Sequence, residues 1–429
     1  MHKIEETEGL CNTCDRRVKA SIYQKNGKIL IETICNKHGK FLSEHIWDDP
    51  EIYKSFSKNQ TIPSNPAQTA LILTYKCNLN CPTCLANANE LKISDFRKKD
   101  LAKVKDCKTV FLTGGEPTIR TDLPKIIRLL KKKGKKVIIL SNGIKLANKN
   151  YVFSLKKAGL DAVRLQFDAT EDKDSLYIRG DKIFKFKKQA IKNMEELKIS
   201  IILATVIIKR NFGSIKRLLE FTYKHPLIHS ISINPLWKLG RYEEKDFIPS
   251  SKIVEEISRI FKIGKKDWIQ TTIFLTNIDK LLSFFGERKR YFCKCNLKCL
   301  FIRDRNKIIS ITKIFNIPKI NQKIERIYEK RSFSRLIIFF FYLLLNQICF
   351  NLFWNKNFRF FLKKLLVNLK NIFTKDFSFF GIFHSINVES FMTTENFDFN
   401  VSRDCNLSGL SPQNLSLRPA CLNRLNPTK

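Results

Sequence analysis

Short apolar runs alternate with longer segments in which apolar side chains recur every three or four positions, and this alternation dominates the middle of the chain. The apolar runs are rich in β-branched residues and fall at 70–73, 109–112, 137–140, 162–167, 199–206 and 231–233. Between them the spacing predicts helices, one of which carries Ile183, Phe186, Ala190, Ile191, Met194 and Leu197 on a single face. Alternating strands and helices predict an α/β fold with a parallel sheet, whose strand-end loops carry the chemistry.

The pattern changes on both sides of this middle part. Residues 1–56 have a hairpin signal at Asn26-Gly27, and residues 57–66 are polar with two prolines, which is typical of a linker. Residues 306–380 are basic and rich in phenylalanine. Their most apolar part, 336–354, approaches the roughly 20 residues that a membrane span needs, but polar residues interrupt it. We expect a helical segment in contact with a membrane surface or lipid; buried core helices and a true span are the alternatives.

Composition narrows the class of protein. The 429 residues have room for two or three domains, and 43% of them are hydrophobic, as in a globular protein. The amino terminus is polar and has no signal-peptide pattern, so the 13 cysteines predict metal and iron-sulfur ligands in a cytoplasmic protein rather than disulfides. The net charge of +38 favours polyanions such as nucleic acid or an acidic membrane surface, although a lysine-rich coding bias explains part of it.

Two pairs of candidate metal ligands flank the hairpin near the amino terminus. Cys11 and Cys14 are separated by two residues, as are Cys35 and His38. Two such pairs on either side of a short hairpin predict a tetrahedral Cys3His site for zinc or iron, in a domain too small to fold on its core alone. A structural role is the favoured interpretation, and nucleic-acid binding by this ribbon is the alternative.

A second set of cysteines directly follows the first apolar run. Cys77, Cys81 and Cys84 lie within eight residues, so one loop can turn three thiolates toward one point. Thiolates in such a cluster select zinc or iron-sulfur, and a set of three leaves one metal position open for a substrate or cofactor. A structural zinc knuckle would need a fourth nearby ligand, whereas the next cysteine, Cys107, stands at the start of a strand-like run.

This cysteine motif resembles that of the radical SAM superfamily. The resemblance implies that Cys77, Cys81 and Cys84 hold a 4Fe-4S cluster whose open iron binds S-adenosylmethionine (SAM). Reductive cleavage of SAM would then give a 5'-deoxyadenosyl radical that removes hydrogen from an unactivated C–H bond. The resemblance also implies a partial (β/α)6 barrel over residues 67–240. Many members have an aromatic residue at the position of Thr83.

Strand-end loops extend the resemblance. Gly114, Gly115 and Glu116 follow the second predicted strand and match the family's GGE motif, whose backbone contacts the methionyl amino group of SAM; adjacent glycines permit such a close approach. Ser141 ends the third strand and Asp168 the fourth, where the family places ribose and carboxylate contacts. We therefore expect these five residues to position SAM.

Further cysteines follow the predicted barrel, in residues 241–305 and in the tail of residues 381–429. Because no matching histidines accompany them, they predict at least one auxiliary iron-sulfur cluster. Buried free thiols are the alternative, and we assign the isolated Cys107 and Cys349 to it. The candidate auxiliary ligands are Cys293, Cys295, Cys299, Cys405 and Cys421.

The resemblance narrows to an archaeal group that contains tetraether lipid synthases and pterin-modifying radical SAM methylases. Members of this group often have paired cysteines at the position of Asp404-Cys405. The matching motifs are Cys11-x-x-Cys14 with Cys35-x-x-His38-Gly39, Leu165-Gln166-Phe167-Asp168 followed by Tyr177 and Arg179-Gly180, Asn234-Pro235, Gly240-Arg241, Phe391-Met392, Asn396-Phe397-Asp398, Arg403-Asp404-Cys405 and Pro419-Ala420-Cys421-Leu422-Asn423.

For the synthases the resemblance implies a carbon-carbon bond between two isoprenoid chains, because a methyl group without an acidic proton requires radical chemistry. We expect this lipid reaction; methylation of a pterin is the alternative. The implied partners are SAM, the isoprenoid lipid or pterin substrate, an electron donor such as ferredoxin, and a membrane surface. A nucleic-acid-binding zinc ribbon with a degenerate barrel is a third hypothesis, which the glycine-rich and cysteine-rich strand ends disfavour.

Overall fold

The structure, a computed structural model, describes residues 1–57, 68–104, 107–236, 241–242, 247–282, 295–304, 307–329, 383–390, 392–399, 407–410 and 418–419. The predicted linker therefore lies almost entirely outside the described residues, and so does the apolar segment 336–354. Among the helices that the structure describes, none combines the length and the apolar character required to cross a membrane.

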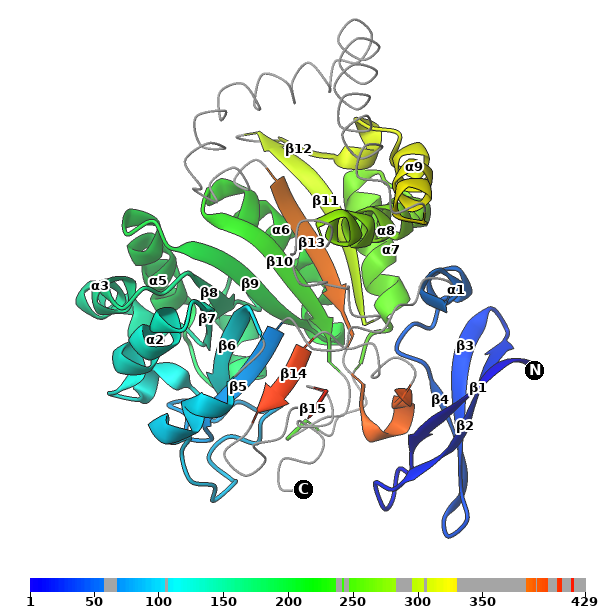
Figure 1. Ribbon diagram of the computed structural model, residues 1–429, viewed down its shortest axis with the longest axis horizontal. Helices are drawn as coiled ribbons and strands as arrows, with labels where there is room; N and C mark the ends of the chain where they lie inside the picture. Colours follow the sequence, from blue (N-terminus) through cyan, green and yellow to red (C-terminus); the bar gives the residue numbers. More distant parts are fainter. Residues whose placement is uncertain are drawn as a thin grey trace, which may run out of the picture.

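The amino-terminal segment is a four-stranded antiparallel sheet followed by a short helix. The strands pair in the order β1-β2-β3-β4, and the β2–β3 hairpin turns at Asn26 and Gly27, which both have positive φ, as predicted. This ribbon lies at the side of the larger sheet (Figure 1). Its elements are β1 (His2–Leu10), β2 (Arg17–Lys25), β3 (Lys28–Cys35), β4 (Gly39–Glu44) and α1 (Pro50–Ser57).

Six parallel strands follow in the order of the chain and form the central part of a second sheet, with each strand paired to the next. All six coincide with the apolar runs of the sequence. They are β5 (Gln68–Thr74), β6 (Thr109–Gly114), β7 (Lys136–Ser141), β8 (Ala162–Gln166), β9 (Ser200–Ile207) and β10 (Ile228–Pro235).

Amphipathic helices cover this sheet. In α2 the buried residues Leu123, Ile126, Ile127 and Leu130 recur at helical spacing and join the main hydrophobic core. Ala190, Ile191 and Met194 of α5 are fully buried, as their periodicity predicts. The connections contain α2 (Leu123–Lys132), α3 (Lys149–Lys157), α4 (Asp172–Arg179), α5 (Phe184–Glu196), α6 (Ile215–Lys224) and the 3-10 helices η1 (Lys98–Lys103), η2 (Pro117–Ile119), η3 (Lys145–Ala147) and η4 (Lys209–Ser214).

The sheet does not end with these six strands. Strand β13 pairs in parallel with β10 at one edge, and β14 pairs in parallel with β5 at the other, so one carboxyl-terminal segment extends both sides (Figure 1). Antiparallel strands complete the order β12-β11-β13-β10-β9-β8-β7-β6-β5-β14-β15. The remaining elements are α7 (Ser250–Phe261), α8 (Lys265–Leu282), β11 (Asn296–Asp304), β12 (Lys307–Ser310), η6 (Ile311–Lys313), α9 (Ile317–Glu329), β13 (Phe383–Glu389), η8 (Thr394–Asn396), β14 (Leu407–Leu410) and β15 (Arg418–Pro419).

Candidate functional site

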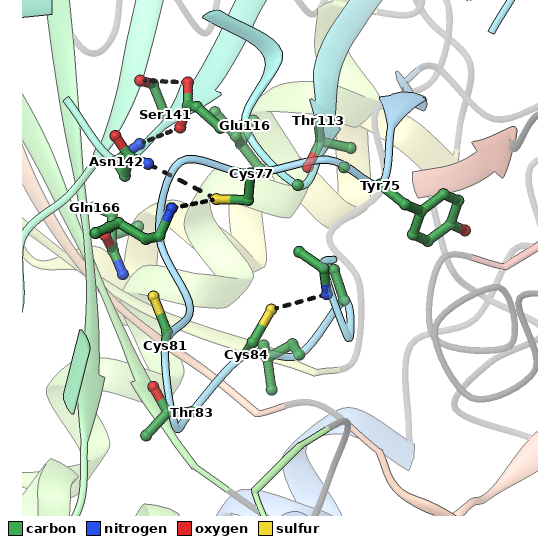
Figure 2. A pocket seen from close by; sticks show the side chains of 18 of the residues that line it. Tyr75, Cys77, Cys81, Thr83, Cys84, Thr113, Glu116, Ser141, Asn142 and Gln166 are labelled. Atoms are coloured by element: carbon green, nitrogen blue, oxygen red, sulfur yellow. Dashed lines mark hydrogen bonds between the residues drawn. The ribbon is translucent and has the colours of Figure 1, made fainter. Parts of the chain in front are cut away.

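Three cysteines follow β5 in one loop at the carboxyl end of the parallel strands. Cys77, Cys81 and Cys84 lie around a shared space (Figure 2) and line one cavity of about 260 Å³. Backbone N–H groups approach two of the sulfurs: Leu79 donates to Cys77 Sγ and Ala88 donates to Cys84 Sγ, each at 3.4 Å. Such bonds stabilise the negative charge of a metal-bound thiolate.

The residues around the cavity fit a cluster with three protein ligands. Burial raises the pKa of Cys77 to about 11, so this thiol needs a metal cation to become a thiolate at neutral pH. Among the described lining residues, the other group able to bind a metal through a charge is the carboxylate of Glu116. Its oxygens already accept hydrogen bonds from Thr118, Ser141 and Asn142. Among the described lining residues no further charged ligand is free, so this lining fits a cluster that has one iron without a protein ligand.

Two glycines bring the end of β6 against the cysteine loop. A Cβ atom on Gly114 would lie 2.1 Å from the Thr74 carbonyl oxygen, and one on Gly115 would lie 2.2 Å from that of Lys76. This approach lets the Gly115 and Glu116 N–H groups donate to the same two oxygens, at 2.7 and 2.9 Å. Any side chain here would push the two loops apart.

The Glu116 side chain connects the ends of two neighbouring strands. Ser141 Oγ donates to it at 2.9 Å and the Asn142 N–H donates at 2.7 Å, so β6 and β7 are held together at the wall of the cavity (Figure 2). Asn142 Nδ2 in turn donates to Asn78 Oδ1 at 2.8 Å, inside the cysteine loop. The Glu116 side chain thus holds the strand ends together, while the backbone of Gly114 and Gly115 lines the cavity.

Asp168 lies behind the cavity wall. Its carboxylate accepts two hydrogen bonds from Arg179, at 2.7 and 2.8 Å, and is 2% exposed. Burial alone would raise the pKa of Asp168, but the Arg179 charge lowers it below its usual range. Arg179 itself lines the cavity beside Cys81 and donates to Thr83 Oγ1 at 3.3 Å. We therefore expect Arg179, held by Asp168, to be the residue of this pair that faces SAM.

Arg241 holds the cysteine loop from the far side of the barrel. Its backbone N–H donates to the Cys84 carbonyl oxygen at 3.0 Å. Its guanidinium donates to the carbonyl oxygens of Cys81, at 2.8 Å, and Ala88, at 2.6 Å, and pairs with Glu90 at 2.5 Å. One side chain thus satisfies both ends of the segment that carries Cys81 and Cys84.

The structure also brings together the four predicted ligands of the amino-terminal site. The β1–β2 turn presents Cys11 and Cys14, the β3–β4 turn presents Cys35 and His38, and their ligand atoms all lie within 4.8 Å of one another. Burial alone would raise the pKa of Cys11, but the N–H groups of Thr13 and Cys14 and the neighbouring thiols lower it to about 6. This arrangement suits a tetrahedral metal ion.

The candidate auxiliary ligands are only partly described. Cys293, Cys405 and Cys421 lie outside the described residues. Cys295 packs partly buried against the main core, and Cys299 belongs to that core, where burial raises its pKa to about 12. The environment of Cys299 is that of a buried free thiol, as is that of Cys107. The predicted auxiliary cluster stays a prediction.

Comparison with known proteins agrees with this geometry. Residues 71–222 match the radical SAM superfamily, and residues 3–48 match the HMPTM N-terminal zinc ribbon domain. A 7,8-dihydro-6-hydroxymethylpterin dimethyltransferase of Methanocaldococcus jannaschii is 27% identical over 76% of this chain and 74% of the relative. A probable GTP 3',8-cyclase of Saccharolobus islandicus is 31% identical over 46% of this chain and 67% of the relative. This chain belongs to the radical SAM superfamily.

A solved structure, Streptococcus suis SuiB bound to S-adenosylmethionine, has a TM-score of 0.42 and 20% sequence identity over 47% of this chain and 49% of SuiB, so the match spans about half of that protein.

Membership of the radical SAM superfamily makes the chain an enzyme and implies a 4Fe-4S cluster and SAM as its cofactors. Arg179 and Arg241 were not among the predicted residues of this radical SAM site, although both stand in motifs that match the family.

Proposed function

We propose that this radical SAM enzyme methylates a pterin. The observation that carries the proposal is the polarity of the barrel interior next to the cavity. Alternate residues of β10 and β13 there are Ser230, Ser232 and Asn234, and Ser385, Asn387 and Glu389. Hydrogen bonds link the two rows: Ser385 Oγ donates to Ser230 at 2.7 Å, and Ser232 Oγ donates to Glu389 at 2.9 Å.

This interior favours a polar substrate over an isoprenoid chain. Within the cavity itself, Arg164 and Gln166 of β8 offer hydrogen-bonding groups to a substrate. Burying such groups against a hydrocarbon costs about 1–3 kcal/mol for each one left without a partner. A pterin instead carries ring nitrogens, a carbonyl and an amino group that can pair with them. Lipid synthesis, our expectation from the sequence, is therefore the less supported of the two reactions.

The relatives support the same choice. The Methanocaldococcus protein, which matches this chain over most of both lengths, is by name a dimethyltransferase of 7,8-dihydro-6-hydroxymethylpterin. The Saccharolobus protein is by name a cyclase of GTP, whose guanine shares the amino-oxo-pyrimidine ring of a pterin. Both names point to a bicyclic, hydrogen-bonding substrate rather than a lipid.

In this proposal each part of the site has a role. Cys77, Cys81 and Cys84 hold the cluster, the backbone of Gly114 and Gly115 together with Ser141 positions SAM, and Asp168 acts through Arg179. When bound, the cluster and SAM supply a carbon radical able to remove hydrogen from a C–H bond. Cys11, Cys14, Cys35 and His38 bind zinc or iron and keep the ribbon folded.

Expression in a host that makes dihydropterins tests the proposal, because the host supplies reductant and methyl donor. Mass spectrometry of the pterin and lipid pools is expected to show pterins heavier by one or two methyl groups with wild-type protein. The same host with Cys81→Ala, which removes a cluster ligand, is expected to show none. Altered isoprenoid lipids with an unchanged pterin pool would refute the proposal and restore the lipid reaction.

A further inference from the structure

A charged pair crosses the inside of the barrel next to the SAM cavity. Arg164 on β8 pairs through Nη2 with Glu389 on β13, 225 residues further along the chain. Their side chains are 18% and 14% exposed, so both charges are largely removed from water. A buried ion pair is a weak source of stability, because desolvation offsets most of the attraction. Its position beside the cavity points instead to a role in recognition.

Glu389 faces the protein rather than the cavity. Ser232 donates to Oε1 at 2.9 Å, Asn296 Nδ2 donates to the same oxygen at 3.2 Å, and Asn234 Nδ2 donates to Oε2 at 3.5 Å. Burial alone would raise the pKa of Glu389, but Arg164 lowers it below its usual range, so the carboxylate is charged at neutral pH. Glu389 therefore neutralises Arg164 and fixes its orientation.

Arg164 is the member of the pair that lines the cavity. A guanidinium has five N–H donors in a planar fork. Within the described part of the chain, Arg164 donates to Glu389 through Nη2. Among the described residues no hydrogen-bond acceptor pairs with Nε or Nη1 of Arg164, so both can donate to a substrate. Ile72, Leu140 and Val206 line the same cavity and offer apolar contacts to the faces of a flat ring.

We infer that Arg164 is a specificity-determining residue, which donates hydrogen bonds to a ring carbonyl or ring nitrogen of the pterin, and that Glu389 positions it. This inference rests on the proposed function. Because the carboxylate cancels the guanidinium charge, the site offers donors without a net positive charge. Such a site suits a neutral heterocycle and disfavours a phosphate group. The substrate is accordingly the free pterin alcohol rather than its diphosphate ester.

Equilibrium dialysis under anaerobic conditions tests this inference with the cluster-loaded enzyme. The probes are 7,8-dihydro-6-hydroxymethylpterin and its diphosphate ester. Wild-type protein is expected to bind the free alcohol more tightly. R164Q is expected to bind it about 10- to 100-fold more weakly, as for a lost bond to a charged donor. E389Q leaves the Arg164 charge uncompensated. The ratio of its affinity for the diphosphate ester to its affinity for the free alcohol is therefore expected to rise roughly tenfold relative to wild type.

The control is K131Q, which breaks the Lys131–Asp161 ion pair outside the cavity and is expected to bind as wild type. Failure of wild-type protein to bind either probe would refute the proposed function itself. If R164Q has full iron content and binds the pterin as tightly as wild-type protein, the role of Arg164 is refuted but the proposed function is not. If R164Q loses iron, R164K replaces it: lysine keeps the charge but not the fork, so weaker pterin binding is expected and unchanged binding would overturn the inference.

Discussion

At the scale of single residues, the radical SAM site depends on side chains that bind neither cluster nor substrate. Arg241 is the clearest case, because its guanidinium gathers two carbonyl oxygens and a carboxylate around the cysteine loop. A planar fork of donors can do this, whereas the ammonium of lysine or the amide of glutamine cannot reach all of these acceptors. Arg241 is therefore a positioning residue for Cys81 and Cys84.

Replacing Arg241 by Gln tests this role. Each carbonyl oxygen left without a partner costs about 1–3 kcal/mol, so the loop opens more often and the cluster is expected to lose iron to a chelator about tenfold faster. The measurement is the decay of the iron-sulfur absorbance under anaerobic conditions. Arg259→Gln removes an exposed arginine of α7 paired with Glu256 and serves as the matched control. Equal decay rates in the two variants would refute the role of Arg241.

Residue types in motifs predicted the candidate ligands but not the residues that hold them in place. The cysteine spacing, the glycine pair and the amino-terminal Cys3His pattern are local features, so the sequence sufficed to predict that each set comes together. Arg179, Arg241 and Glu389 act across 96 to 225 residues of chain. Their partners follow from the pairing of distant strands and loops, which no local pattern contains.

At the scale of elements, the junction between β5 and β6 sets the geometry of the site. The six central strands were predictable because each is a continuous apolar run, as expected for a sheet covered on both faces. The additions of β13 and β14 were not, because each pairs with a strand that lies far away in the sequence. Within the predicted part, the Gly114-Gly115 turn is the point at which two strand ends touch.

Replacing Gly115 by Ala is expected to separate these strand ends. A Cβ only 2.2 Å from the Lys76 oxygen forces the cysteine loop to move, so we expect iron content per chain to fall at least severalfold and SAM binding to be lost. Gly213→Ala is the matched control, since a Cβ there meets nothing within 4 Å. Iron analysis and SAM dialysis measure the effect, and wild-type values for Gly115→Ala would contradict the assigned close approach.

At the scale of the whole molecule, the ribbon is attached to the barrel through the carboxyl-terminal segment 392–399. Thr7 Oγ1 donates to Asp398 at 2.6 Å, and His45 lies 3.5 Å from the same carboxylate. Asp48 accepts from Ser251, and Lys265 pairs with Asp49. The ribbon therefore contacts both the chain between β13 and β14 and the helices α7 and α8.

Removing the ribbon's metal is expected to loosen this contact. Cys14→Ser deletes one ligand, and a ribbon of this size depends on its metal for folding. We expect loss of about one metal ion per chain and faster proteolytic cleavage near residues 392–399, measured by metal analysis and mass spectrometry of fragments. Thr13→Ser, an exposed neighbour, is the control. If residues 392–399 of metal-free Cys14→Ser are cleaved no faster than in wild-type protein, the metal site does not support the contact between the ribbon and the barrel.

The placement of β13 and β14 also bears on how the protein is made. During translation, β5 to β10 leave the ribosome long before residue 383, so both flanks of the nascent sheet stay unpaired and Arg164 lacks its counter-ion. Strands β13 and β14 supply the two missing neighbours. A ribosome that stalls or stops upstream of this segment would release a chain prone to aggregate, and Arg164 can be positioned by Glu389 only after β13 has been synthesised.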